Sequence, residues 1–126
     1  MTTTQLPTDK QPSIRVAAMP KDANPGGSIF GGWIMSQIDF AASIPALERA
    51  KGRVVTVAVN SMEFHEPVFV GDIISCYTDI VKTGYSSVTV KVEVYAERNP
   101  ANKQIVKVTE AELTYVALDE NRKPRQ

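Results

Sequence analysis

The stretch from Asn24 to Ala50 constrains this chain more than any other. From Gly31 onward it has the composition of a helix of about 20 residues, which at 1.5 Å per residue is about 30 Å long. The first half of that helix carries apolar side chains on every side of the helical wheel, namely Trp33, Ile34, Met35, Ile38, Phe40, Ala41, Ala42 and Ile44. A helix that is apolar all round is enclosed by protein. We therefore expect the rest of the chain to wrap around it.

A single carboxylate, Asp39, lies within this apolar surround, about two turns after Gly31 and Gly32. A charge in such a place costs several kcal/mol unless it is paired or hydrated. Two interpretations follow. Asp39 either is kept for chemistry or is a core polar group satisfied by hydrogen bonds, because structural networks also perturb carboxylates.

The paired glycines open the helix, and Ser28 is expected to be its N-cap. The first turn presents free backbone N–H groups with a partial positive charge, and glycine leaves no side chain between them and a ligand. A carbonyl or oxyanion could therefore bind at Gly31 and Gly32, as in an oxyanion hole. The alternative is that these glycines only allow the helix to pack closely on a sheet. Asn24 lies in a loop rich in turn formers, where its amide could orient water or a ligand.

Outside the helix the apolar residues recur with a period of two, which predicts strands. These strands cover residues 14–18, 54–64, 73–81, 88–97 and 106–117. The alternation changes phase near Asn60 and again near Thr109, and each change predicts a bulge. Pro45 is expected to kink the helix or separate its last turn.

The order of elements is one strand, the helix and four further strands joined mostly by short connections. Successive strands with hairpin-length loops form an antiparallel sheet, whose apolar face must cover the apolar helix. The fold class is therefore α+β, with a long helix wrapped by a curved sheet of about five strands. An open sheet leaves two edges that need a cover or a partner, which favours an oligomer over a monomer.

Length and composition limit the function classes. The 126 residues form one domain, with 14 basic and 14 acidic side chains, so no net charge attracts nucleic acid or an anionic membrane. No apolar run is long enough to span a membrane or to act as a signal peptide, and a cytoplasmic protein is expected. Residues 1–12 are interpreted as a flexible arm, 13–120 as the domain and 121–126 as a basic tail. The single cysteine, Cys76, is predicted to be a buried structural thiol.

Several runs resemble a known family. The sequence NPGGSIFGGWIMSQIDFAAS, followed by GRVVTVAVNSMEF, EPVFVGD and a closing KPR, resembles the YciA-like acyl-CoA thioester hydrolases of the hotdog superfamily. The resemblance covers nearly the whole chain after about residue 13. It implies the hotdog fold, a homodimer with active sites at the subunit interface, and in many members a hexamer built as a trimer of dimers.

The resemblance also implies roles for particular residues in hydrolysing an acyl-CoA to a carboxylic acid and coenzyme A. The N–H groups of Gly31 and Gly32 would polarise the thioester carbonyl. Asp39 would either deprotonate a water molecule or attack the carbonyl directly and form an anhydride, two routes that the sequence leaves open. Asn24 would position water or the thioester from across the subunit boundary. No metal or redox cofactor is expected. Coenzyme A is part of the substrate and is released as a product.

Coenzyme A carries phosphates, which need local donors in a protein of zero net charge. The segment Gly84, Tyr85, Ser86 and Ser87 offers N–H groups and hydroxyls, and Arg122, Lys123 and Arg125 concentrate positive charge in the tail. Arg53 is a weaker candidate of the same kind. The alternative is a plain hairpin and a solvated tail.

Two rival functions remain on the same fold. A non-catalytic module that binds or senses acyl-CoA would not need Asp39 for chemistry. A hotdog dehydratase would need a histidine beside an acid, but the only histidine, His65, follows a predicted strand far in sequence from the helix start and is interpreted as a strand-end residue. Motifs of zinc proteases, serine hydrolases and nucleotide hydrolases do not occur.

Overall fold

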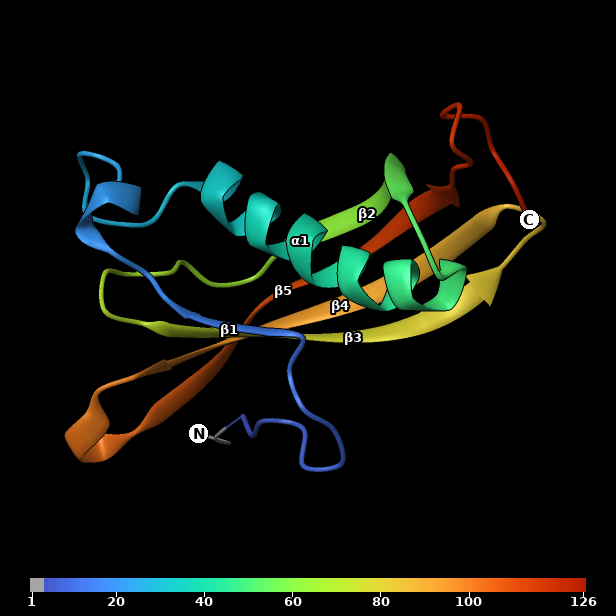
Figure 1. Cartoon of the computed structure of the whole chain (residues 1–126). Helices are drawn as coiled ribbons and strands as arrows, with labels where there is room; N and C mark the ends of the chain where they lie inside the picture. Colours follow the sequence, from blue (N-terminus) through green and yellow to red (C-terminus); the bar gives the residue numbers. More distant parts are fainter. Residues whose placement is uncertain (1–3) are drawn as a thin grey trace.

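The computed structural model describes residues 4–126 and contains one long helix and five strands (Figure 1). The elements are β1 (Ile14–Ala17), α1 (Gly31–Ala50), β2 (Val54–Phe64), β3 (Ile73–Thr83), β4 (Ser87–Arg98) and β5 (Gln104–Ala117), with short 3₁₀ turns at Pro20–Asp22 and Pro100–Asn102. The predicted helix and all five predicted strands are confirmed. No helix within residues 4–126 is long and apolar enough to cross a membrane.

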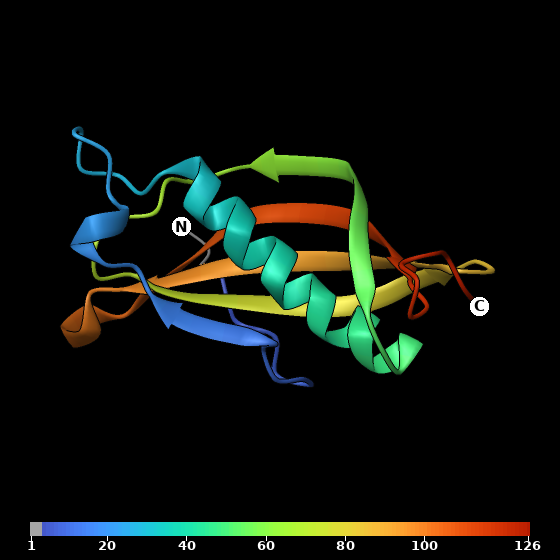
Figure 2. The same ribbon diagram turned by 45° about the horizontal axis from the view of Figure 1, so that its top comes forward.

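The five strands form one antiparallel sheet in the order β1-β3-β4-β5-β2. The pairing of β2 differs from the expectation that successive strands lie side by side, because β2 pairs with β5 at the far edge of the sheet. The chain reaches that edge through α1, which crosses the sheet obliquely (Figure 2). After β2 it returns to the opposite side through residues 65–72, where Pro67 cannot extend a ladder of hydrogen bonds.

Helix α1 packs on one face of the sheet, as expected for a hotdog fold. Its buried residues are Ile34, Ile38, Ala41, Ala42 and Ala46. They meet the core faces of β3, β4 and β5, including Cys76, whose burial confirms the predicted structural thiol. The opposite side of the helix is open, with Phe40 66% exposed and Leu47 49% exposed. Complete enclosure of the helix is therefore not achieved within one chain.

The expected N-cap is wrong, and one of the two alternatives for Pro45 is excluded. Phe30, not Ser28, is the residue at the N-cap position, and no side chain caps the first turn. Ser28 instead pairs with Phe69 in an isolated bridge, so it belongs to the preceding loop. Pro45 does not separate the last turn, since α1 continues to Ala50. Beyond it, Lys51 adopts the left-handed conformation that commonly ends a helix.

The predicted bulges are confirmed by the strand register. The β2–β5 pairing shifts between Val59 and Ser61, and a further shift lies between Thr56 and Ala58. In the β4–β5 pairing, Val94 lies opposite Thr109 and the next residue, Tyr95, lies opposite Lys107, so one residue of β5 is skipped. Bulges twist a strand and re-aim its side chains. The shift after Thr56 lies where β2 passes the middle of α1.

Candidate active site

Asp39 lies on α1 where the helix faces β2 and β5, and two hydroxyl groups bind the same carboxylate oxygen. Thr56 Oγ1 donates to Asp39 Oδ1 across 2.7 Å, and Tyr115 Oη lies 2.6 Å from that oxygen. Tyr115 Oη is also 2.7 Å from the backbone carbonyl oxygen of Asp39. Thr56 and Tyr115 are register partners in the β2–β5 pairing. No hydrogen bond within the described part of the chain reaches the second oxygen, Oδ2.

A cavity of about 210 Å³ opens beside this carboxylate. Its walls come from α1, β2 and β5 and comprise Met35, Ser36, Asp39, Thr56, Val59, Met62 and Leu113. Most of these side chains are apolar, and Asp39 is the one charged group among them. An apolar cavity with a few polar groups is the usual form of a small-molecule site. The cavity therefore suits a short hydrocarbon group attached to a polar, reactive centre.

The start of α1 offers unused backbone donors. Within residues 4–126 neither the Gly31 nor the Gly32 N–H has a hydrogen-bond acceptor, whereas the Phe30 N–H binds the Asp22 carbonyl. A methyl group placed on either glycine would meet no atom within 4 Å. Close packing inside this chain therefore does not require glycine at these positions. The open space at the helix start remains free for a ligand or for a second copy of the chain.

His65 lies close to this helix start, which the sequence did not indicate. A cavity of about 290 Å³ is lined by Ser28 and Gly31 on one side and by Phe64 and His65 on the other. The imidazole is partly exposed, and its Nε2 is 3.9 Å from a carboxylate oxygen of Glu63. His65 directly follows β2 and its N–H still binds the Val108 carbonyl, so the strand-end position is confirmed.

The side chain of Asn24 shapes its own loop. Its Oδ1 accepts a hydrogen bond from the Gly26 N–H at 2.9 Å, and its Nδ2 donates to Ser28 Oγ at 3.0 Å. Gly27 adopts a positive φ of 98° in this turn, which glycine tolerates without strain. Both ends of the amide thus have protein partners, and no bond joins Asn24 to Asp39.

The segment before α1 is held by the turn between β2 and β3. The Ile29 N–H donates to the Val68 carbonyl at 2.8 Å. Asp72, only 3% exposed, accepts hydrogen bonds from the Phe69 N–H and from Arg98 Nη2, at 3.0 and 2.9 Å. The Arg98 guanidinium also lies over the Phe69 ring, 5.1 Å from its centroid. This ion pair connects β4 to the turn that supports the helix start.

The predicted coenzyme A donors lie at the other end of the molecule. The hairpin residues Gly84, Ser86 and Ser87 line a cavity of about 270 Å³ together with the end of α1 and Gln126. Some of their groups are used internally, because the Gly84 N–H binds the Ser87 carbonyl and the Ser86 carbonyl accepts from the Ala117 N–H. Tyr85 is 75% exposed.

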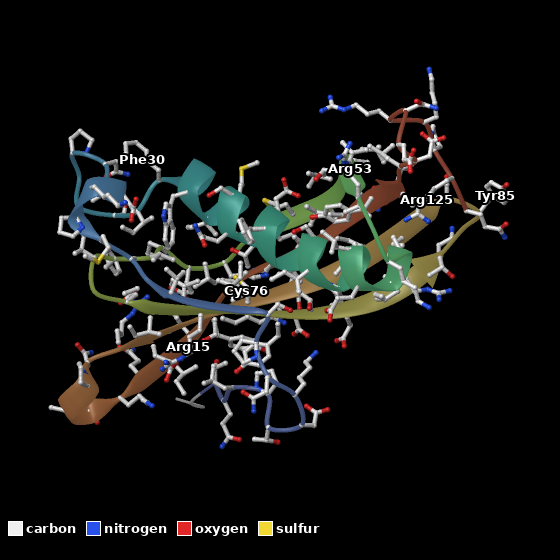
Figure 3. The ribbon with its side chains drawn as sticks, viewed as in Figure 1. Arg15, Phe30, Arg53, Cys76, Tyr85 and Arg125 are labelled. Atoms are coloured by element: carbon white, nitrogen blue, oxygen red, sulfur yellow. The ribbon has the colours of Figure 1, made fainter. Side chains whose placement is uncertain are left out.

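Of the three basic residues in the tail, one makes hydrogen bonds within the chain and two are exposed. Arg125 donates to the carbonyls of Leu118, Ala50 and Gln126, so it caps the end of α1 instead of projecting into solvent. Arg122 and Lys123 are exposed. Figure 3 shows Arg53, Arg125 and Tyr85 together at one end of the molecule and Phe30 at the opposite end.

One chain therefore does not bring all the predicted site residues together. The thioester-binding candidates, Asn24, Gly31 and Gly32, precede or begin α1, whereas the hairpin and tail lie beyond its end. Asp39 lies between the two groups. In the described range there is no group of three or more His, Cys, Asp or Glu side chains that could hold a metal ion.

Comparison with known proteins gives consistent matches. The family model described as the thioesterase superfamily matches residues 26–101. The acyl-CoA thioester hydrolase YciA of Escherichia coli K12 is 47% identical over 114 residues, which are 89% of this chain and 86% of that protein.

Two solved structures agree closely with this fold. A hexameric hotdog fold thioesterase of Campylobacter jejuni has a TM-score of 0.86 and 45% identity, covering 93% of this chain and 91% of its own. An acyl-CoA hydrolase of Staphylococcus aureus, solved with butyryl coenzyme A, coenzyme A and coenzyme A disulfide, has a TM-score of 0.82 and 32% identity, covering 90% and 68%.

Proposed function

The chain belongs to the thioesterase superfamily and is an acyl-CoA thioester hydrolase, and we propose that Asp39 is its reacting carboxylate. The observation that supports this proposal most is the hydrogen bonding of that side chain. Thr56 and Tyr115 both bind Oδ1, so Oδ2 is the oxygen left to activate water or to attack a carbonyl. The adjoining cavity has apolar walls that can hold the start of an acyl chain.

The N–H groups at Gly31 and Gly32 are proposed to polarise the thioester carbonyl. Their lack of acceptors and the open space above them support this role. As the negative charge grows on the carbonyl oxygen, donors fixed in position stabilise it without reorganising. Asp39 then either removes a proton from water or forms an anhydride that water cleaves, and both routes release coenzyme A as a thiol. The proposed reaction needs only protein groups and water.

The active centre is proposed to form between two copies of the chain. Gly32 and Asp39 are seven residues apart on one helix, so their positions differ by about 10 Å along its axis. This separation favours a thioester that binds the Gly32 N–H of one chain and reacts with Asp39 of another. The glycines and Asn24 of one copy would therefore act with Asp39 of another. The exposed β2 edge, with Val55, Val57 and Val59 uncovered, is the proposed contact.

Binding of the coenzyme A phosphates is assigned to the exposed donors of the hairpin and tail. Arg122 and Lys123 are free to move toward a phosphate, and Ser87 lies in the neighbouring hairpin cavity. Arg125 contributes less in this proposal because its donors already bind carbonyl oxygens. The chain is further proposed to form a homodimer and to assemble into a hexamer, the state named for the Campylobacter jejuni protein.

The deciding experiment measures release of free thiol from acyl-CoAs of increasing chain length. Wild type is compared with Asp39→Asn, which keeps the shape of the side chain, and with Glu48→Gln as a control on the exposed face of the same helix. We expect turnover by wild type and Glu48→Gln and a loss of about a hundredfold or more in Asp39→Asn. Binding of acyl-CoA by wild type without thiol release would contradict hydrolysis and favour the sensing module.

A further inference from the structure

Tyr115 makes two contacts with a single residue of α1. Its ring is 1% exposed on the core face of β5, and its hydroxyl reaches both the backbone carbonyl oxygen and the carboxylate Oδ1 of Asp39, at 2.7 and 2.6 Å. A phenol has one proton, so that proton is shared between two acceptors of the same residue. The contact joins positions 76 residues apart in the sequence.

These two contacts fix Asp39 in a way that one contact could not. A bond to the carboxylate alone would let the side chain and the phenol rotate together, whereas the backbone carbonyl is part of a rigid helix. The phenol therefore fixes the orientation of the carboxylate relative to the helix axis. Thr56 adds a second donor to Oδ1 from β2. Rotation of the carboxylate would break both bonds, so the position of Oδ2 is fixed as well.

The phenol remains a donor under ordinary conditions. Burial raises the pKa of Tyr115 well above its usual value of 10, and the hydrogen bond to Asp39 raises it further. Asp39 from α1 and Thr56 from β2 are the polar groups that face it. A phenol that keeps its proton remains available to donate to the carboxylate.

We propose that Tyr115 is a positioning residue for thioester hydrolysis, which orients the Asp39 carboxylate through these two contacts and leaves Oδ2 as the reacting oxygen. The proposal rests on the proposed role of Asp39. Tyr115 touches no substrate in this account. It acts through Asp39, so its removal should impair the chemical step without weakening the binding of acyl-CoA.

The test is Tyr115→Phe, which keeps the buried ring and removes only the hydroxyl. We expect kcat to fall about tenfold while KM stays within about twofold, since the lost bond is to a charged group. Tyr77→Phe is the matched control, since Tyr77 is 4% exposed and packs edge-on against Tyr95 without touching α1.

A double-variant cycle separates positioning from packing. In the Asp39→Asn background, adding Tyr115→Phe should change the residual turnover by less than about twofold. An unchanged kcat in Tyr115→Phe, or an equal loss of turnover in both backgrounds, would overturn the proposal. If Tyr115→Phe folds poorly, the cycle is run on the folded fraction, judged by its melting temperature. Full turnover by Asp39→Asn would instead contradict the role of Asp39 itself.

Discussion

Thr56 Oγ1 donates a hydrogen bond to Asp39 Oδ1 across 2.7 Å and so connects the edge strand β2 to the middle of α1. The bond depends on the register of the sheet, because Thr56 lies opposite Tyr115 and immediately before a shift in the β2–β5 pairing. Beyond this shift, the side chains of β2 depart from the regular alternation between the two faces of the sheet. Register partners on neighbouring antiparallel strands project to the same face of the sheet, so the two hydroxyls meet on one carboxylate oxygen.

Replacing Thr56 by Val removes this hydroxyl while keeping the branched shape. We expect kcat to fall about tenfold, because a hydrogen bond to a charged group is lost at a centre where orientation matters. Steady-state hydrolysis of a short acyl-CoA measures the effect. Thr89→Val is the control: Thr89 is also a strand threonine, more buried than Thr56, and its hydroxyl contacts Thr114, away from Asp39. Equal losses in both variants would contradict a specific role for Thr56.

The periodicity of the sequence was sufficient to predict each element of this fold. The helix from Gly31 to Ala50 and the bulge near Asn60 agree with the structure. The position of β2 was not predictable in the same way, because consecutive strands pair as a hairpin only when a short loop joins them, and residues 65–72 form a longer connection between β2 and β3. The connection at residues 65–72 contains a proline and a glycine with positive φ, Gly71, and leads to the far side of the sheet.

The unpredicted position of β2 also explains which site residues were not identified from the sequence. Asp39 was found because a lone carboxylate in an apolar helix is conspicuous. Thr56 and Tyr115 looked like ordinary strand residues, and only the pairing of β2 with β5 brings them together at Asp39. His65 was thought remote from the helix start for the same reason. Its approach to Gly31 depends on where β2 ends relative to α1.

Replacing Gly32 by Ala should separate stability from activity. In one chain the added methyl group meets no atom within 4 Å, and alanine favours a helix over glycine by up to about 1 kcal/mol. The free energy of unfolding should therefore stay the same or rise. Turnover should fall about a hundredfold, because the methyl group displaces a thioester bound at the helix start. Denaturant unfolding and thiol release measure the two quantities. Unimpaired turnover would remove Gly32 from the proposed centre.

Asp72→Ala should be costly for stability. Asp72 is almost fully buried and pairs with Arg98, which is 17% exposed, so the variant leaves a largely buried guanidinium without its partner. Breaking a buried pair in this way typically costs about 3–5 kcal/mol. Urea unfolding should show a loss in this range. The control is Asp79→Ala, whose exposed pair with Lys10 is expected to contribute less than about 1 kcal/mol. Similar losses in the two variants would contradict the structural role of the Asp72 pair.

The outer face of the sheet carries a cluster whose contribution to stability depends on pH. Lys107 lies 2.9 Å from a carboxylate oxygen of Glu93 and also pairs with Glu110. Its hydrogen bonds lower the pKa of Glu93 and of Glu110 below their ordinary value of 4.5. Because the folded pKa is the lower one, the unfolded chain binds more protons near that value. The stabilisation is therefore present above 4.5 and is lost as the pH falls through the folded pKa.

Lys107→Met removes the cation and tests this sign. Near neutral pH we expect the variant to be less stable by about 1 kcal/mol, since pairs of this exposure contribute at most about that amount each. Glu93 and Glu110 are register partners, and without Lys107 their like charges repel. Protonation relieves that repulsion, so the difference between wild type and variant should shrink as the pH is lowered from about 7 to about 3. Urea unfolding over this pH series, with Lys21→Met as an exposed control, measures it. A difference that stays constant with pH would contradict stabilisation of the sheet through the charge of Lys107.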